Sequence, residues 1–191
     1  MKYNKEIIEE FHGYENVLKD IKTLCESMHV TMSCAESCTS GRIASHLGQL
    51  AGSSNYFKGG VVSYWTDVKE VVLGVDKHDI KVHDVVSEVV AEQMANGVAS
   101  LMDTDFAIAT TGYAGPGGGT DKIKVGTVCF AYKTPFGTKT EKLVFENQSR
   151  EEVVESATQH ALQTMVAALI DYNKRRRNVT GRITDDDLRL D

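Results

Sequence analysis

Small hydroxyl and thiol side chains crowd one ten-residue stretch of the chain, where the pattern changes from β-favouring to helix-favouring. The stretch is Ser33-Cys34-Ala35-Glu36-Ser37-Cys38-Thr39-Ser40-Gly41-Arg42. The flanking residues predict a strand end, a tight turn and a helix start. A helix start presents unpaired N–H groups and a partial positive charge, which suit a phosphate or the oxyanion formed when a nucleophile attacks a carbonyl. The alternative is an ordinary Ser/Thr N-cap.

Two nucleophiles lie in this turn, Ser37 and Cys38. A thiol at a helix N-terminus can have a lowered pKa, whereas a serine needs a base. The six histidines are scattered, none at a triad spacing, so we expect packing or surface roles for them. A lysine can serve as the base if burial lowers its pKa. Lys69, five residues after Tyr64 and just past a predicted strand, is the candidate; an ordinary solvated lysine is the alternative.

A glycine-rich loop follows the buried-type strand 106–111 and spans Gly112-Tyr113-Ala114-Gly115-Pro116-Gly117-Gly118-Gly119-Thr120. It is neither a dinucleotide fingerprint nor a Walker A loop. Consecutive glycines can form a nest of N–H groups for an anion, and ligands of α/β proteins bind at the carboxyl ends of strands. The alternative is a plain surface loop. Arg150 lies in the first turn of a helix, where a cation opposes the helix dipole, so we expect it to have a structural carboxylate or an anionic ligand as its partner.

The remaining chain alternates helical and β-type hydrophobic patterns. Helices are predicted where apolar residues recur at helical spacing, over residues 4–28, 66–74, 88–102 and from 149 onward. Strands are predicted in β-favouring runs at 56–65, 106–111, 125–132 and 143–145. Residues 76–85 show no clear pattern, and the charged stretch 174–191 is predicted to be a disordered tail. This order predicts a single domain over residues 1–173, an α/β sandwich with a mixed sheet.

Composition narrows the function class. The 191 residues suffice for one full core, and a net charge of −6 argues against a general nucleic-acid or anionic-membrane binder. No run is apolar enough to span a bilayer or to act as a signal peptide, so we expect a cytoplasmic protein whose four cysteines are reduced. Neither C-x-x-C nor H-E-x-x-H occurs, so no metal site is expected.

Seven motifs in a fixed order carry a family resemblance. They are Ala35-Glu36-Ser37-Cys38-Thr39, Gly59-Gly60-Val61-Val62-Ser63-Tyr64, Lys69 with Leu73-Gly74-Val75, Val86-Ser87-Glu88, Thr111-Gly112 with Ala114-Gly115-Pro116-Gly117-Gly118, Val125-Gly126-Thr127-Val128, and Arg150. Together, over residues 14–172, the chain resembles the CinA C-terminal domain family, the nicotinamide-nucleotide amidases. The resemblance implies a three-layer α/β/α sandwich. It also implies hydrolysis of the carboxamide of nicotinamide mononucleotide to nicotinate mononucleotide and ammonia, in pyridine-nucleotide salvage, without metal or cofactor.

The resemblance also implies roles for residues. Ser37 would be the nucleophile, with Tyr64 and Lys69 as catalytic partners. The implied substrate-binding residues are Glu36, Thr39, Gly41, Thr111, Gly112, Gly115, Gly117 and Arg150. The implied partner is a small nucleotide. We also expect neither a nucleic acid nor a membrane as partner, in line with the net charge, and a homo-oligomer such as a dimer. The N-terminal domain frequent in the family is absent here, so we expect a stand-alone form.

A mechanism follows as a hypothesis. Lys69 takes the proton of Ser37 directly or through the Tyr64 hydroxyl, and N–H groups at the helix start stabilise the oxyanion. The phosphate is expected at Arg150, at Thr111 or in the glycine loop, with Arg150 favoured.

Three departures from the family pattern leave the substrate open. Ser40 replaces a glycine and would be strained at a positive φ. Asn147-Gln148-Ser149 replaces the usual Gly-Asp before Arg150, and Tyr113 replaces a smaller aliphatic residue and could narrow the pocket. A non-catalytic nucleotide-binding module and an amidase for a different amide therefore remain alternatives.

Overall fold

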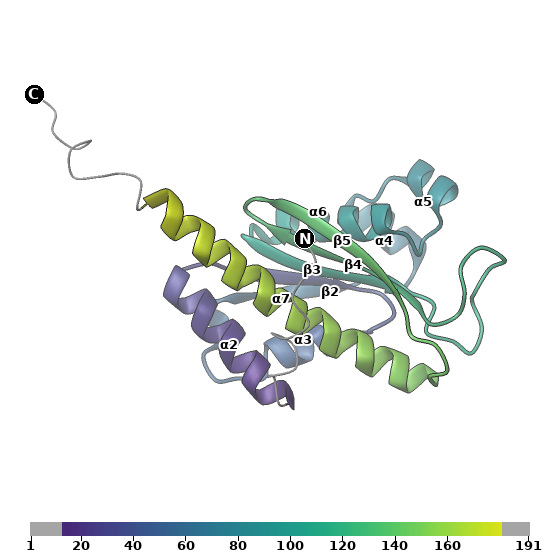
Figure 1. Ribbon diagram of the computed structural model, residues 1–191. Helices are drawn as coiled ribbons and strands as arrows, with labels where there is room; N and C mark the ends of the chain where they lie inside the picture. Colours follow the sequence, from purple (N-terminus) through teal and green to yellow (C-terminus); the bar gives the residue numbers. More distant parts are fainter. Residues whose placement is uncertain (1–12, 181–191) are drawn as a thin grey trace, which may run out of the picture.

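A five-stranded mixed sheet forms the centre of the molecule in the computed structural model, which describes residues 13–180 (Figure 1). The strands are β1 (Met32–Glu36), β2 (Phe57–Val62), β3 (Phe106–Gly112), β4 (Thr127–Thr134) and β5 (Gly137–Val144). Their order across the sheet is β2-β1-β3-β4-β5. β2, β1 and β3 run parallel, whereas β4 and β5 form an antiparallel hairpin beside β3. The mixed sheet expected from the sequence is confirmed.

Helices cover both faces of this sheet (Figure 1). One layer contains α2 (Gly13–Met28), α3 (Arg42–Leu47) and α7 (Arg150–Thr180); the other contains α4 (Thr66–Leu73), α5 (Lys77–His83) and α6 (Glu88–Met102). The result is the three-layer α/β/α sandwich that the sequence predicts. The apolar side chains of α2, such as Leu18 and Ile21, are buried in the core that α2 shares with α7, so they serve packing within this chain.

The two faces of the sheet differ in side-chain size. Large residues such as Met32, Phe106 and Phe130 face the α2/α3/α7 layer, and alanines face α6. The alanines are Ala35, Ala107, Ala109 and Ala131. Small side chains let α6 pack close to the sheet, where it contacts all five strands.

The three parallel strands end at one edge of the sheet, which brings distant motifs together. Glu36 at the end of β1 is in register with Val62 on β2 and with Thr110 on β3. The residues that follow, Ser37, Ser63 and Thr111, therefore lie side by side. This edge is the usual ligand position in α/β folds.

The structure corrects several predicted boundaries. β1 extends through Glu36, so the turn begins only at Ser37. Residues 76–85, expected to be irregular, contain α5, which Asp76 caps by accepting from two backbone N–H groups. The sequence feature that could have predicted α5 is Asp76, because aspartate is a favoured N-cap residue.

The last helix is longer than predicted. α7 continues to Thr180, so residues 174–180 are not part of a disordered tail. An ion pair between Arg175 and Asp171 and a hydrogen bond from Arg176 to the carbonyl of Met28 stabilise the C-terminal part of α7. The expectations for residues 181–191 and for the first part of the predicted helix 4–28 lie outside the described residues. Between residues 13 and 180, no helix has both the length and the apolar character that a bilayer crossing requires.

Candidate active site

The Ser37 hydroxyl stands at the carboxyl edge of the sheet, immediately after β1. The Ser37 N–H donates to the carbonyl of Thr110 at 3.0 Å, and the Ser63 N–H donates to the carbonyl of Glu36 at 2.8 Å. These two bonds extend the parallel ladders by one residue past Glu36. The position of Ser37 is therefore set by the sheet itself.

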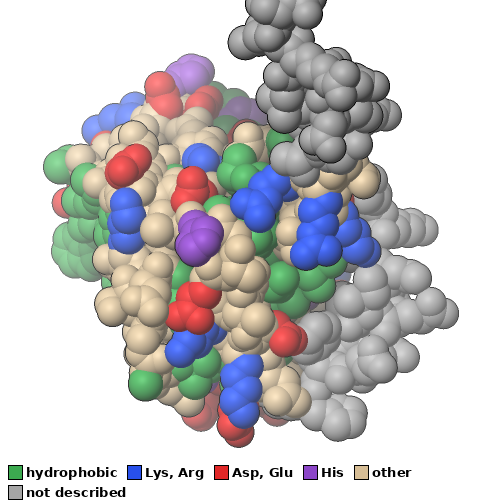
Figure 2. All heavy atoms as spheres, turned by 90° about the vertical axis from the view of Figure 1, so that its left-hand side faces the viewer, with side chains coloured by type: hydrophobic (Ala, Val, Ile, Leu, Met, Phe, Trp, Pro, Cys, Tyr) green, Lys and Arg blue, Asp and Glu red, His purple; other side chains and the backbone are tan. Residues whose placement is uncertain are grey.

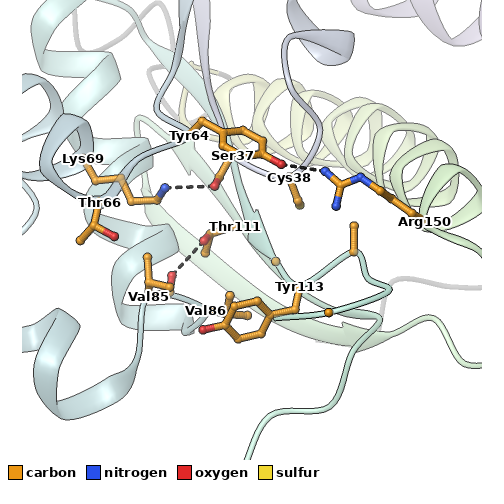
Figure 3. A pocket seen from close by; sticks show the side chains of 13 residues that line it. Ser37, Cys38, Tyr64, Thr66, Lys69, Val85, Val86, Thr111, Tyr113 and Arg150 are labelled. Atoms are coloured by element: carbon orange, nitrogen blue, oxygen red, sulfur yellow. Dashed lines mark hydrogen bonds between the residues drawn. The ribbon is translucent and has the colours of Figure 1, made fainter. Parts of the chain in front are cut away.

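Lys69 reaches Ser37 from α4. Its Nζ donates to Ser37 Oγ at 3.0 Å and also to the carbonyl of Ser63 (Figure 3). α4 begins three residues before Lys69 and ends at Gly74, whose left-handed conformation terminates the helix. The lysine therefore points from the first turn of a short helix into the space above the strand ends.

Burial makes Lys69 chemically unusual. The residue is only 1% exposed, and no carboxylate forms an ion pair with it among the described residues. Desolvation penalises the ammonium form and lowers the pKa of Lys69 to about 8. At neutral pH a fraction of the lysine is thus uncharged, with a lone pair able to accept the Ser37 proton. A serine–lysine pair of this kind is a variant of the serine–histidine arrangement.

Cys38 does not have the low pKa expected of a thiol at a helix start. The residue is 5% exposed, and burial raises the pKa of its thiol to about 12. Proximity to Lys69 and Arg150 lowers this pKa, but less than burial raises it. The expectation of an activated thiol is therefore wrong: Cys38 stays a protonated thiol at neutral pH.

The start of α3 is occupied by a side chain of this protein. The buried carboxylate of Glu36 accepts from the N–H groups of Gly41, Ile43 and Ala44 at 2.9, 3.2 and 2.7 Å. A carboxylate is well suited to these donors because the helix N-terminus carries partial positive charge. The expectation that these groups stabilise an oxyanion is therefore corrected; Glu36 already satisfies them.

The turn between β1 and α3 has strained backbone geometry. Ser40 has a φ of 52° and Gly41 a φ of 91°, both in the left-handed region. The suspected strain at Ser40 is confirmed, since a side chain is disfavoured there relative to glycine. Tertiary packing keeps the turn in this conformation nonetheless.

Tyr64 and Arg150 form one side of the cavity. Arg150 donates through Nη2 to the Tyr64 hydroxyl at 2.7 Å (Figure 3). It also donates through Nη1 to the carbonyl of Gly115 at 2.9 Å. Arg150 thus joins the end of β2 to the glycine-rich loop. The described contacts of the Tyr64 hydroxyl include neither Ser37 nor Lys69, so a proton route through Tyr64 is not present in this structure.

The local capping of α7 explains the position of Arg150. Ser149 and Glu152 form a reciprocal capping box at the helix start, with bonds of 2.7 and 3.3 Å. The side chains of the capping box accept from backbone N–H groups at the helix start, so Arg150 is not needed there and its side chain extends toward the cavity.

The opposite side of the cavity comes from β3 and from the segment before α6. Thr111 donates to the carbonyl of Val85 at 2.8 Å, and the Tyr113 hydroxyl donates to Asp84 Oδ1 at 2.8 Å. Figure 3 shows Tyr113 on the side of the cavity opposite Tyr64. Gly112 is required by close packing, since a Cβ would lie 2.8 Å from the carbonyl of Thr127.

These residues enclose a cavity of about 250 Å³, which we call the reaction cavity. Its lining contains seven predicted site residues, namely Ser37, Tyr64, Lys69, Thr111, Gly112, Gly117 and Arg150. Gly115 contributes its carbonyl to Arg150. Four further lining residues were not predicted as site residues: Thr66, Val85, Val86 and Ala114. Val86 and Ala114 belong to the family motifs, and Thr66 lies at a predicted helix start, so these three had a sequence signal, whereas Val85 had none.

Besides Gly115, three predicted substrate-binding residues lie outside the cavity lining. Glu36 and Thr39 are fully buried, and Thr39 shares a hydroxyl hydrogen bond with Thr110 at 2.8 Å. Gly41 donates its N–H to Glu36. All three hold the turn that carries Ser37 in place. Among residues 13–180, no cluster of three or more His, Cys, Asp or Glu side chains could hold a metal ion.

Sequence comparison finds relatives over most of the described chain. The family model of the CinA C-terminal domain matches residues 14–169. A CinA-like protein of Flavobacterium psychrophilum is 47% identical over 146 residues, covering 76% of this chain and 35% of that protein. A CinA-like protein of Mycolicibacterium gilvum is 46% identical over 139 residues, covering 73% of this chain and 33% of that protein. The chain thus spans about a third of the length of these curated relatives.

Solved structures share the fold along almost their whole length. The competence damage-inducible protein A of Klebsiella pneumoniae superposes with a TM-score of 0.80 at 32% identity, covering 83% of this chain and 98% of that one. The competence/damage inducible protein CihA of Agrobacterium tumefaciens superposes with a TM-score of 0.78 at 35% identity, covering 82% of this chain and 96% of that one.

Proposed function

Because the chain belongs to the CinA C-terminal domain family, we propose that it is an amidohydrolase acting through a serine acyl-enzyme. The proposed substrate is nicotinamide mononucleotide, and the products are nicotinate mononucleotide and ammonia. The observation that carries the proposal is the buried Lys69 beside Ser37 Oγ, at 3.0 Å and with a pKa lowered to about 8. A module that only binds nucleotides would gain nothing from burying an unpaired lysine, which costs stability.

Acylation begins when neutral Lys69 removes the Ser37 proton. Ser37 Oγ attacks the carboxamide carbon, and the carbonyl oxygen becomes an oxyanion. The Lys69 ammonium then returns the proton to the amide nitrogen, and the C–N bond breaks to release ammonia. The pyridinium charge of the substrate favours attack because it withdraws electrons from the carbonyl.

The oxyanion needs donors other than the start of α3, which Glu36 occupies. We assign it to the N–H groups of Cys38 and Thr39, the residues that follow the nucleophile. Within the described part of the chain, neither group donates a backbone hydrogen bond in the turn. One such donor typically lowers the barrier by about 3–4 kcal/mol.

Deacylation uses the same groups in reverse. Lys69, neutral again after ammonia has left, takes a proton from water, and the hydroxide attacks the acyl carbon. The proton then returns to Ser37 Oγ as the ester bond breaks, which releases the carboxylate product. Arg150 is suited to the substrate phosphate because its guanidinium lines the cavity and can form charge-assisted hydrogen bonds.

The first experiment measures ammonia release from nicotinamide mononucleotide by the purified protein. We expect Ser37→Ala to lower turnover by roughly a thousandfold or more, because no acyl-enzyme can form. Cys38→Ser is the matched control; it should keep most activity, since the thiol is protonated and not the nucleophile. Nicotinamide as substrate tests the need for the phosphoribosyl group.

Two outcomes would contradict the proposal. Full activity of Ser37→Ala would remove the nucleophile assignment. No release by folded wild-type protein would favour the binding-module alternative if the nucleotide still raises the melting temperature.

A second candidate, an amidase for a different amide, is favoured by one observation. Tyr113 lines the reaction cavity and is held there by its hydrogen bond to Asp84. Faster ammonia release from another heteroaromatic amide than from the nucleotide would support this candidate.

A further inference from the structure

A second cavity adjoins the reaction cavity on the far side of Tyr113. It has a volume of about 530 Å³ and shares Thr66, Val85 and Tyr113 with the reaction cavity. We call it the outer pocket. Its other walls come from three separate segments: α5, the end of the glycine-rich loop, and β5.

Each of these segments brings a lysine to the outer pocket. Lys81 comes from α5, Lys122 from the loop and Lys142 from β5. Among the described residues, none of the three forms an ion pair or a side-chain hydrogen bond. Three like charges facing one space repel each other, and an anion would relieve that repulsion.

The one carboxylate in the lining does not neutralise these lysines. Asp84 Oδ1 accepts from the Val86 N–H at 2.9 Å and from the Tyr113 hydroxyl at 2.8 Å. Counting three lysines against one aspartate leaves these four side chains at +2. This local charge stands in a chain whose net charge is −6.

Several cations elsewhere in the described chain pair with carboxylates. Lys139 and Arg175 both pair with Asp171, and Lys124 pairs with Glu146. Acidic and basic side chains lie interspersed on the face shown in Figure 2. The outer pocket thus differs from the ordinary arrangement of charges on this protein.

We propose that the outer pocket binds a phosphate or pyrophosphate group of a nucleotide, with Lys81, Lys122 and Lys142 as its ligands. Lysine is a common point-charge ligand for phosphate, and the Thr120 hydroxyl in the lining can add a hydrogen bond. A nucleic acid fits less well, because the negative charge of the whole chain repels an extended polyanion. The nucleotide identity rests on the proposed function, whereas anion binding does not.

Tyr113 separates the phosphate site from the reaction cavity. Its hydroxyl is fixed by Asp84, and burial together with that carboxylate raises the pKa of Tyr113 to about 12. The hydroxyl therefore remains a donor at neutral pH, and the ring remains a wall between the two spaces. A ligand that occupies both must pass this ring.

The test measures binding of inorganic pyrophosphate by titration calorimetry at low ionic strength, using the full chain with Ser37→Ala. We expect the combined change Lys81→Ala, Lys122→Ala and Lys142→Ala to weaken binding by roughly tenfold or more. Lys124→Ala is the matched control: it lies two residues from Lys122, is exposed, and lines neither cavity. It should change affinity less than twofold. Added salt should weaken binding to the unmodified pocket.

Unchanged affinity in the triple variant would overturn the proposal, as would loss of binding in Arg150→Ala alone, because the anion would then lie at Arg150. The lysines are exposed, so folding should survive, and the melting temperature verifies it. Pyrophosphate binding needs no turnover, so a failure to bind pyrophosphate can be told apart from a lack of amidase activity. The Michaelis constant for nicotinamide mononucleotide in an active background then identifies the source of the phosphate. A rise in this constant in the triple variant would place the substrate phosphate in the outer pocket instead of at Arg150, whereas an unchanged constant would mean that the pocket binds a second ligand.

Discussion

Two connections at the same edge of the sheet carry the two reacting groups, and they are held in different ways. The turn after β1 carries Ser37, and the buried Glu36 carboxylate fixes it through three backbone N–H groups. The connection after β2 leads to Lys69, yet its residues Tyr64 and Trp65 are 51% and 73% exposed. No side chain caps the helix that follows it.

The difference shows that a nucleophile and a base need different kinds of support. Ser37 must have a fixed position, which local hydrogen bonds to the backbone provide. Lys69 must have a lowered pKa, which no local hydrogen bond to its ammonium could provide, because such bonds favour the charged form. Burial lowers the pKa, and α4 needs only to deliver the side chain into the interior.

Removing the base is expected to have the largest effect. Lys69→Met keeps an apolar chain of similar length in the buried space but has no lone-pair nitrogen. We expect turnover to fall by roughly a thousandfold, nearly as far as in Ser37→Ala. Ammonia release under substrate saturation measures it. A loss of only a few-fold would mean that Lys69 is not the base and that burial of this lysine serves another purpose.

The pH profile sharpens the same point. Because Lys69 acts in its neutral form, kcat/KM should rise with pH and level off above its pKa of about 8. At pH 7 about a tenth of the lysine is neutral, so activity there should be about a tenth of the plateau. The residual activity of Lys69→Met should lack this rise. A flat wild-type profile between pH 6.5 and 9 would contradict the assigned role.

A moderate effect is expected when the support of the nucleophile is weakened. Glu36→Gln keeps the shape but replaces one accepting oxygen by a donor that faces backbone N–H groups. We expect a loss of unfolding free energy of about 1–3 kcal/mol and a lower kcat with a smaller change in KM, because Ser37 loses its fixed position. Urea unfolding and steady-state kinetics measure the two quantities.

Trp65→Ala is the matched control from the other connection. Because the Trp65 ring is exposed, we expect its removal to change the free energy of unfolding by no more than about 0.5 kcal/mol. If Trp65→Ala cost as much stability as Glu36→Gln, the contrast between the two connections would be wrong.

The smallest effect concerns strain in the turn after β1. Ser40→Gly removes a Cβ at a φ of 52°, and we expect a gain in unfolding free energy of about 1 kcal/mol. Thermal unfolding measures it, with Ser53→Gly, in the short helix before β2 and without a positive φ, as the control. A destabilised Ser40→Gly would show that the serine is not strained there.

Local patterns in the sequence predicted most elements of the fold. The helix expected over 88–102 is α6, and Ser87 caps it by accepting from the Val90 N–H. α5 was missed because its hydrophobic pattern is weak, and α7 was cut short because a run of three arginines resembles a solvated tail. In the structure those arginines belong to a helix that packs against α2.

The sequence by itself determined the order of the elements other than α5 and, through the ordered motifs, the family. These features depend on residue type and short-range spacing, which a linear chain displays directly. Only the tertiary structure decided that Glu36 occupies the start of α3, that Cys38 stays protonated and that Lys69 has a lowered pKa. It also brought Lys81, Lys122 and Lys142 to one pocket. Burial and convergence of this kind depend on segments far apart in the sequence, so no local pattern contains them.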